Sequence, residues 1–192
     1  MKLTEYLTDS FSREGIISEE DKEIVQFGLE SLSGNLLGIV LILAIGIGFG
    51  HILEAILLWI FWFFLRKNAG GFHAKTKMGC LLTSSVMLVL SFMIFVSHRN
   101  SVMFYTICVF INGGIIWLIS PVDNSIKQLD LMEQKAYQSR SRIILIVEEI
   151  IWGVGTWLRI DAIMKSIVMA LFIVGISLVL GRVKNLYMKN LR

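Results

Sequence analysis

The sequence predicts an all-α integral membrane protein with about six transmembrane helices and an amphipathic helix at its N-terminus. Of its 192 residues, 55% are hydrophobic and only 17% are charged. The mean hydropathy of +0.71 is far above that of an ordinary soluble domain. Apolar runs of helix length recur along the chain, with one proline and no Gly/Ser-rich linker between them. We therefore expect a single domain over residues 1–192.

The N-terminal residues 1–23 carry charges of both signs before any apolar run, unlike a cleaved secretory signal. Leu3, Leu7 and Phe11 recur at intervals of four residues, with charged residues between them. This pattern is typical of an amphipathic helix lying along a membrane surface. Ser18, followed by three acidic residues, predicts the N-cap of the helix that becomes the first span.

Six apolar runs are candidates for membrane spans. They cover residues 31–49, 52–65, 81–97, 102–119, 143–158 and 166–181. An unbroken helix over residues 36–65 would be roughly 45 Å long, too long for a hydrocarbon core of ~30 Å. We therefore expect a tight turn at Gly50 and His51.

Basic residues alternate between the two sides of this arrangement. Fifteen of the 18 Lys and Arg residues fall in the two termini and in the loops after the second and fourth spans. The positive-inside rule then places both termini and these loops in the cytosol. Four spans remain an alternative, because Glu54 and the Glu148–Glu149 pair interrupt the second and fifth runs.

The segment 66–80, RKNAGGFHAKTKMGC, is where a nucleophile and a base lie close in sequence. His73 and Cys80 would be ~10 Å apart along a straight helix, too far for proton transfer. The chain must therefore fold back between them. Gly70 and Gly71 before the histidine, and Gly79 before the cysteine, supply conformational freedom for this, at positions where a Cβ would obstruct the fold.

Cys80 should lie near the N-terminus of the third span. The helix dipole, Lys75, Lys77 and a protonated His73 would favour its thiolate form. Unpaired N–H groups of the first turn could hold an oxyanion.

Each of these residues also has a structural interpretation. A cysteine at a membrane interface is commonly a small packing residue, and a histidine in a basic loop is commonly solvated. His73 and Cys80 supply too few ligands for zinc, and His51 and His98 fall on the opposite side, so we expect no metal and no cofactor. Cys108, in an apolar run, is expected to pack as a small hydrophobe, without a disulfide.

Carboxylates within apolar runs are costly when ionised, so they should face a polar interior, be paired or be protonated. Glu148 and Glu149 point about 100° apart on a helix and cannot both face lipid; Glu148 is a candidate for substrate contact. Two alternatives to catalysis stay open. One is a transporter that uses Glu54 and Glu148 as intramembrane charges, and the other is a protein that only docks a peptide on its basic face.

The residues from Arg66 to Ala74, followed by Cys80, resemble the signature of AgrB, the accessory gene regulator B family of membrane endopeptidases. The length, the multi-span hydropathy and the order of the basic loops are similar too. The resemblance implies a homodimeric cysteine endopeptidase of the bacterial cytoplasmic membrane. In it Cys80 is the nucleophile, His73 its base, and Arg66 and Gly71 have supporting roles.

The resemblance also implies the substrate, an AgrD-like propeptide that is cut on its C-terminal side and closed to a thiolactone for quorum sensing. We expect the lipid bilayer and this peptide as partners, and no nucleic acid. The acidic tail of the peptide should be attracted by cations beside the nucleophile, within about 8 Å at ~0.15 M salt. These cations are Arg66, Lys67, Lys75 and Lys77, whereas the C-terminal Arg182, Lys184, Lys189 and Arg192 were expected to be more distant.

Overall fold

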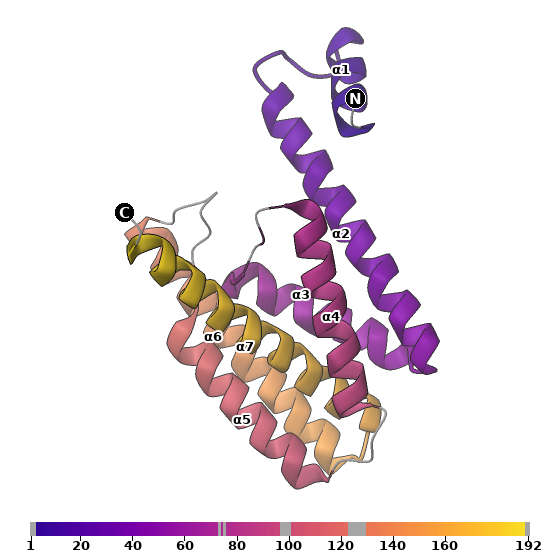
Figure 1. Cartoon of the computed structure of the whole chain (residues 1–192), viewed down its shortest axis with the longest axis vertical. Coiled ribbons are helices and arrows are strands. Elements are labelled where there is room, and N and C mark those ends of the chain that lie inside the picture. Colours follow the sequence, from indigo (N-terminus) through magenta and orange to yellow (C-terminus); the bar gives the residue numbers. More distant parts are fainter. Residues whose placement is uncertain (1–2, 73, 75, 97–100, 123–129, 191–192) are drawn as a thin grey trace. The chain divides into compact units, whose positions relative to one another are not determined.

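The computed structural model describes residues 3–72, 74, 76–96, 101–122 and 130–190, and this part of the chain is helical, as the sequence predicts. The chain forms two compact units, Met1–Leu41 and Ile42–Arg192. Seven helices lie within the described residues (Figure 1). They are α1 (Leu3–Arg13), α2 (Lys22–Phe49), α3 (Ile52–Ala69), α4 (Lys77–Phe95), α5 (Val102–Ile119), α6 (Leu131–Trp157) and α7 (Asp161–Asn190).

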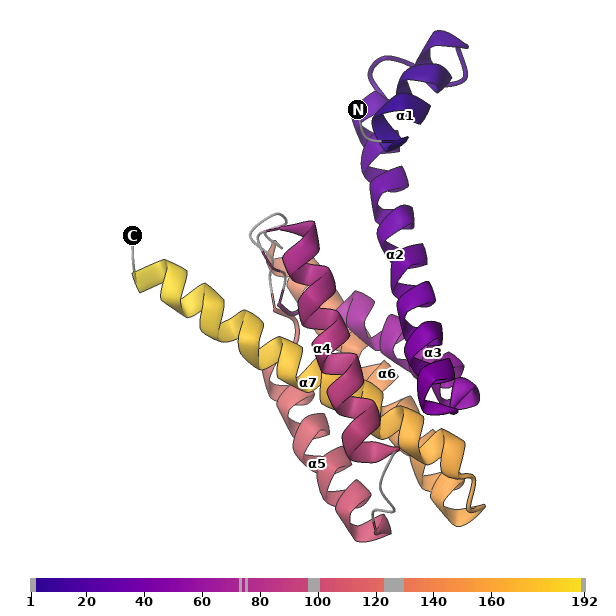
Figure 2. The same ribbon diagram turned by 45° about the vertical axis from the view of Figure 1, so that its right-hand side comes forward.

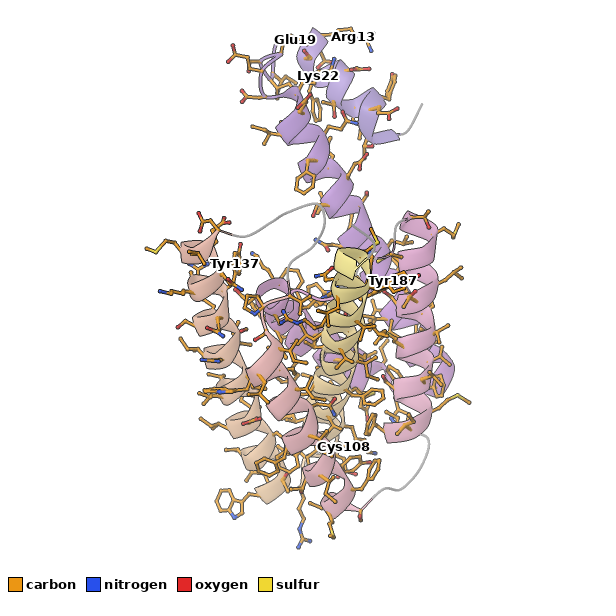
Figure 3. All side chains as sticks on the ribbon, turned by 60° about the vertical axis from the view of Figure 1, so that its left-hand side comes forward. Arg13, Glu19, Lys22, Cys108, Tyr137 and Tyr187 are labelled. Carbon is orange, nitrogen blue, oxygen red and sulfur yellow. The ribbon has the colours of Figure 1, made fainter. Side chains whose placement is uncertain are left out.

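The first unit contains the predicted amphipathic helix, α1, and the start of α2. An ion pair joins the Lys22 ammonium to the Asp9 carboxylate at 2.8 Å. Its hydrogen bond and charge lower the pKa of Asp9 and raise that of Lys22. The Ser18 hydroxyl accepts a hydrogen bond from the Asp21 N–H at 3.2 Å, so the predicted capping serine closes the turn from which α2 begins. Lys22 is labelled in Figure 3.

The second unit is a bundle built around α7, which packs against α3, α4, α5 and α6 (Figure 2). The middle of α7 is apolar on all faces and almost completely buried, as a central helix must be. Its core includes Ile167, Met169, Leu171 and Leu178.

The turn predicted between the first two spans is present. Phe49 ends α2, Gly50 has a φ of +73°, and α3 begins at Ile52. The His51 N–H donates to the Gly46 carbonyl at 2.8 Å, which closes the end of α2. The turn is therefore fixed by local hydrogen bonds.

By length and composition, four of the described helices can cross a membrane, namely α2, α4, α5 and α7. The other two expected spans form helices, α3 and α6, but carry more charge. They are the two runs that the sequence shows to be interrupted by carboxylates. A capping box of Asp130 and Glu133 starts α6 at Leu131, about three turns before the expected residue 143.

The helices α3 to α7 run alternately up and down, so that every second connection lies at the same end of the bundle. At one end the Val122 N–H donates to the Ala69 carbonyl at 3.0 Å, joining the α5–α6 and α3–α4 connections. We call this the basic end. Its described cations include Arg66, Lys67, Lys135, Arg140, Arg142, Arg182 and Lys184.

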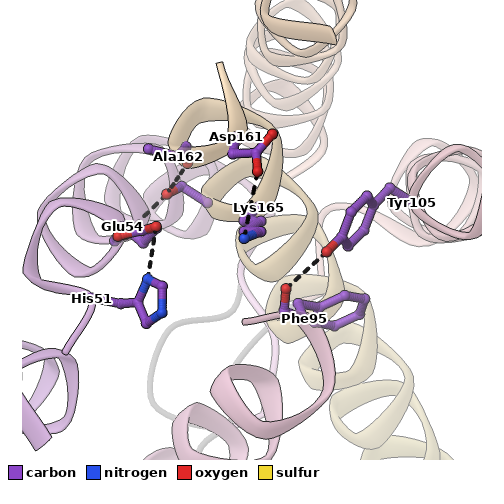
Figure 4. A network of polar contacts seen from close by, with 8 residues as sticks. His51, Glu54, Phe95, Tyr105, Asp161, Ala162 and Lys165 are labelled. Atoms are coloured by element: carbon purple, nitrogen blue, oxygen red, sulfur yellow. Dashed lines mark hydrogen bonds and ion pairs between the residues drawn. The ribbon is translucent and has the colours of Figure 1, made fainter. Parts of the chain in front are cut away.

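We call the other end of the bundle the opposite end. It holds the α2–α3 and α6–α7 turns (Figure 4). There the Ser166 hydroxyl donates to the Glu54 carbonyl at 3.0 Å. The Glu54 carboxylate lies 2.9 Å from the His51 ring, so this carboxylate is paired, as one of the expectations required. Lys165 and Asp161 form a longer pair at 3.9 Å.

Candidate active site

The chain leaves α3 through two glycines with positive φ, +71° at Gly70 and +130° at Gly71. These values confirm the predicted need for glycine here, because other residues rarely adopt them. The Phe72 N–H then donates to two oxygens of Ser177, the backbone carbonyl at 2.8 Å and the side-chain hydroxyl at 3.1 Å. Residues 70–72 are thus tied to α7, far away in the sequence.

Arg66 clamps the same segment from the other side. Its Nη1 donates to the Gly70 carbonyl, and its Nη2 donates to the Phe72 carbonyl at 2.8 Å. Desolvation lowers the pKa of Arg66 to about 10, with the nearness of Cys80 acting in the opposite direction, so the guanidinium stays charged at neutral pH. We call this arrangement of Arg66, residues 70–72 and Ser177 the clamp.

The guanidinium of Arg66 is engaged with loop carbonyls but keeps its charge, so its attraction of a peptide tail and its supporting role in catalysis both stay predictions. What the structure shows is that it fixes the carbonyls of Gly70 and Phe72. A fixed guanidinium fork suits this task, since it presents parallel donors in one plane.

Glycine is required at position 71 for space as well as for φ. A Cβ atom there would collide with Arg66 Nη1 and lie 2.8 Å from the Ser177 hydroxyl. On the other side, Gly181 lets α7 approach, because a Cβ there would lie 2.9 Å from the Phe72 nitrogen. Small residues at 177 and 181, one helical turn apart, form the surface that receives the loop.

Cys80 lies in the first turn of α4, as predicted. It is half-buried and its thiol is free. Thr76 is the N-cap: its hydroxyl accepts from the Gly79 N–H at 3.0 Å, and its carbonyl accepts from the Cys80 N–H at 3.0 Å. The N–H groups of Gly79 and Cys80 are therefore engaged. The first-turn donors that remain as candidates for holding an oxyanion are the N–H groups of Lys77 and Met78.

Of the two reasons predicted for Gly79, the obstruction by a Cβ is confirmed: a Cβ there would meet the Thr76 hydroxyl at 2.9 Å and the Ala74 methyl at 3.2 Å. The need for conformational freedom is wrong at this position, because Gly79 lies in regular helix. Close packing under the cap explains the glycine.

His73 and Lys75 lie outside the described residues, as does the side chain of Lys77. The Cys/His dyad and the role of these two lysines therefore stay predictions. What the structure describes is both boundaries of the segment 73–75. Phe72 is bonded to α7 on one side, and Thr76 caps α4 on the other.

The described cations around the clamp differ from the expected set. Lys67 is exposed at the end of α3. Lys184 was expected to be distant, but its ammonium lies over the Phe72 ring, 5.4 Å from the centroid. The reason is that α7 continues beyond Gly181 and carries its last turns past the loop.

Sequence reasoning missed Ser177, Gly181, Val122 and Lys184. A polar residue and a glycine four positions apart on an otherwise apolar helix were the available signal for the first two. For Val122 and Lys184 the sequence offered none, since only the packing of the loops brings them here.

Glu148 is buried, with 3% of its surface exposed, and its carboxylate oxygens have no hydrogen-bond partner among the described residues. The described residues give it no polar surroundings, and its contact with a substrate stays a prediction. It borders an apolar groove of about 290 Å³ between α3 and α6, and none of the described residues of 66–80 is in the lining. Glu149 turns toward Gly113, where a Cβ would collide with its carboxylate. Both carboxyl groups therefore point into the bundle.

Cys108 is half-buried in α5, and its thiol is free as well. Figure 3 shows it toward the end of the bundle away from Tyr137 and Tyr187, which lie at the basic end. Cys108 is thus separate from the Cys80 region, in keeping with a packing role.

Comparison with known proteins gives the family. Residues 2–178 match the sequence profile described as Accessory gene regulator B. A Clostridium perfringens (strain SM101 / Type A) protein named "Putative AgrB-like protein" is 25% identical over 182 residues, covering 87% of this chain and 85% of that protein. A second, "Putative AgrB-like protein 2" of Clostridium perfringens (strain 13 / Type A), is 26% identical over 151 residues, covering 75% and 71%. No solved structure matches. The profile covers nearly the whole chain, both compact units included, and the chain therefore belongs to the accessory gene regulator B family.

Proposed function

We propose that this chain is a membrane cysteine endopeptidase that cuts an AgrD-like propeptide on its C-terminal side for agr quorum sensing. Family membership supports a role in that system. The observation that carries the catalytic proposal is the bracketing of residues 73–75. The clamp fixes the chain up to Phe72, and Thr76 then starts the helix that presents Cys80 in its first turn.

This arrangement favours a return of the chain between base and nucleophile. Seven residues of continuous helix would keep His73 and Cys80 apart, but α4 begins only at Lys77. The segment before it is not helical at Gly70, Gly71 or Thr76. We therefore propose that His73 reaches the thiol with α4 intact.

In the proposed reaction His73 accepts the proton of the Cys80 thiol, and the thiolate attacks the carbonyl carbon of the scissile peptide bond. The tetrahedral intermediate collapses as the C–N bond breaks. The leaving amine takes the proton back from His73, which releases the C-terminal fragment. An acyl thioester remains on Cys80.

A thiol within the N-terminal part of the substrate then attacks this thioester. It closes a thiolactone and restores the Cys80 thiol, so one thioester replaces another and this step is close to thermoneutral. Cutting an amide to form a thioester is uphill, so removal of the fragment or the cyclic product must drive the overall reaction. Exclusion of water at a membrane edge would protect the acyl-enzyme from hydrolysis.

We further propose six spans, with the basic end and both termini in the cytosol and the chain acting as a homodimer. The 15 to 3 distribution of basic residues supports the orientation. The up-and-down order of α3 to α7 supports it too, because it brings the basic connections to one end of the bundle.

The test is co-expression with an AgrD-like propeptide, followed by mass spectrometry of the products. We expect Cys80→Ala and His73→Ala to abolish cleavage and Cys108→Ala to preserve it, with all three proteins inserted in the membrane at normal levels. Substantial cleavage by the Cys80→Ala protein would show that Cys80 is not the nucleophile.

A transporter without covalent chemistry is the second candidate. The burial of Glu148 without a described partner favours it, because such carboxyl groups mark ion or substrate pathways in membranes. Glu54, the other carboxylate of that hypothesis, is paired with His51 at the opposite end. Export of an uncut peptide that survives Cys80→Ala but not Glu148→Ala would favour the transporter.

A further inference from the structure

A polar cleft opens at the basic end, beside the clamp and outside every residue that the sequence singled out for substrate contact. It has a volume of about 420 Å³ and lies between the end of α5, the first turns of α6 and Arg182 on α7. Sites for small ligands and peptide segments fall in the range of roughly 300–1,000 Å³. Its lining consists of Leu118, Ile119, Ser120, Pro121, Leu131, Gln134, Lys135, Gln138 and Arg182.

Among the residues that the structure describes, the charges that line this cleft are of one sign. Lys135 and Arg182 are both exposed, and neither forms an ion pair with another residue of the described chain. Gln134 and Gln138 add amide N–H donors on the same face of α6. The nearest acidic residues in the described part of the sequence, Asp130 and Glu133, bond to each other's backbone N–H in the capping box and are not among the described lining residues.

The cleft shares a wall with the candidate active site. Pro121 lines the cleft, and the next residue, Val122, donates its N–H to the Ala69 carbonyl at 3.0 Å. Val122 also pairs with Gly70 in a parallel bridge. The segment Pro121–Val122 therefore borders the cleft through Pro121 and contacts the clamp through Val122.

We propose that this cleft binds an acidic stretch of the peptide substrate, with Lys135 and Arg182 donating to its carboxylates and the two glutamines donating to its backbone carbonyls. The proposal rests on the proposed function, since it names the place where that substrate is held. Two cations without a partner in the described chain and two amide donors fit carboxylates and peptide carbonyls together. An anionic lipid headgroup would use the cations alone, so the contribution of the glutamines distinguishes the two.

Binding is tested without cleavage, using the Cys80→Ala protein in phosphatidylcholine nanodiscs and a fluorescent Glu-rich peptide. The control peptide has Gln in place of Glu. Lys135→Gln/Arg182→Gln should weaken binding of the acidic peptide roughly tenfold, as expected for two exposed charge pairs. Gln134→Ala/Gln138→Ala should weaken it about threefold, and the Gln peptide should bind weakly to every variant. A matched pair, Arg140→Gln/Arg159→Asn, removes the same charge outside the cleft and should leave binding unchanged; asparagine suits the positive φ of Arg159.

Three outcomes would overturn the proposal. They are equal losses in the cleft pair and the control pair, no effect of the glutamines, or complete displacement of the peptide by phosphatidylglycerol in the nanodisc. The last would identify a lipid site. Because this assay uses a protein without the nucleophile, its failure does not bear on catalysis, whereas failure of wild-type protein to cleave any propeptide would refute the proposed function alone.

Discussion

The two ends of the helical bundle close their connections in opposite ways. At the opposite end, the α2–α3 and α6–α7 connections span two and three residues and are fixed mainly by local hydrogen bonds, such as those of His51 and Ile160. At the basic end, the α3–α4 connection spans residues 70–76 and is held by bonds to α7. Long connections held by distant side chains can position reacting groups, whereas tight turns mainly join helices.

The charges differ in the same sense. At the opposite end, the Glu54 carboxylate lies 2.9 Å from the His51 ring, and Asp161 lies 3.9 Å from the Lys165 ammonium. At the basic end, Arg66 donates to backbone carbonyls, and Lys135 and Arg182 form no ion pair within the described chain. Both carboxylates at the first end thus have a basic side chain nearby, whereas Lys135 and Arg182 at the second end face no described acid.

The largest expected difference between the ends is their side of the membrane. In a Cys80→Ser/Cys108→Ser background, Asp161→Cys should react with an impermeant maleimide added to intact cells. Lys135→Cys should react only after permeabilisation. Both positions are exposed, so access to the reagent decides the outcome. Labelling of Lys135→Cys from outside would reverse the proposed orientation.

Two glycines with positive φ allow a matched comparison of the ends. Gly71→Ala should reduce propeptide processing roughly a hundredfold, because the new Cβ displaces Arg66 and adds backbone strain of about 1–2 kcal/mol. At Gly50 a Cβ meets nothing within 4 Å. Gly50→Ala should therefore cost only about 1 kcal/mol of stability and leave processing within about twofold. Rates from mass spectrometry and thermal unfolding in detergent check both, and similar losses of processing would contradict the contrast.

The guanidinium of Arg66 should matter for its shape and not only for its charge. Arg66→Lys keeps the charge but cannot donate to the Gly70 and Phe72 carbonyls together, so processing should fall roughly tenfold. The matched change at the opposite end is Lys165→Gln, which breaks a pair at 3.9 Å and should change processing less than about twofold. Normal activity of Arg66→Lys would show that the clamp is not needed for catalysis.

The two serines of α7 offer the smallest contrast. Ser177→Ala removes one of two acceptors for the Phe72 N–H, because the Ser177 carbonyl remains, and should slow processing by about threefold. Ser166→Ala removes a bond to the Glu54 carbonyl at the opposite end and should affect stability without changing the processing rate. Equal processing rates for the two variants would show that the hydroxyl of Ser177 does not contribute to the reaction.

Much of the fold follows from the sequence, because helices in a membrane must satisfy their own backbone and bury apolar length. The apolar runs marked the helices, and the helix-length limit located the turn at Gly50. The boundaries were less certain where polar residues extend a helix, as at the start of α6 and the end of α7. There capping and tertiary packing, not hydropathy, set the ends.

For the candidate site, the sequence by itself determined the candidate residues: a cysteine in a first helical turn, a histidine upstream of it, and an arginine four residues before two glycines. Only the tertiary structure decided what the arginine does and which residues of α7 receive the loop. The reason is that backbone carbonyls and nitrogens, present at every position, are the partners of Arg66 and Ser177. A sequence shows which side chains can donate or accept, but the packing of α3 against α7 determines which carbonyl lies within reach.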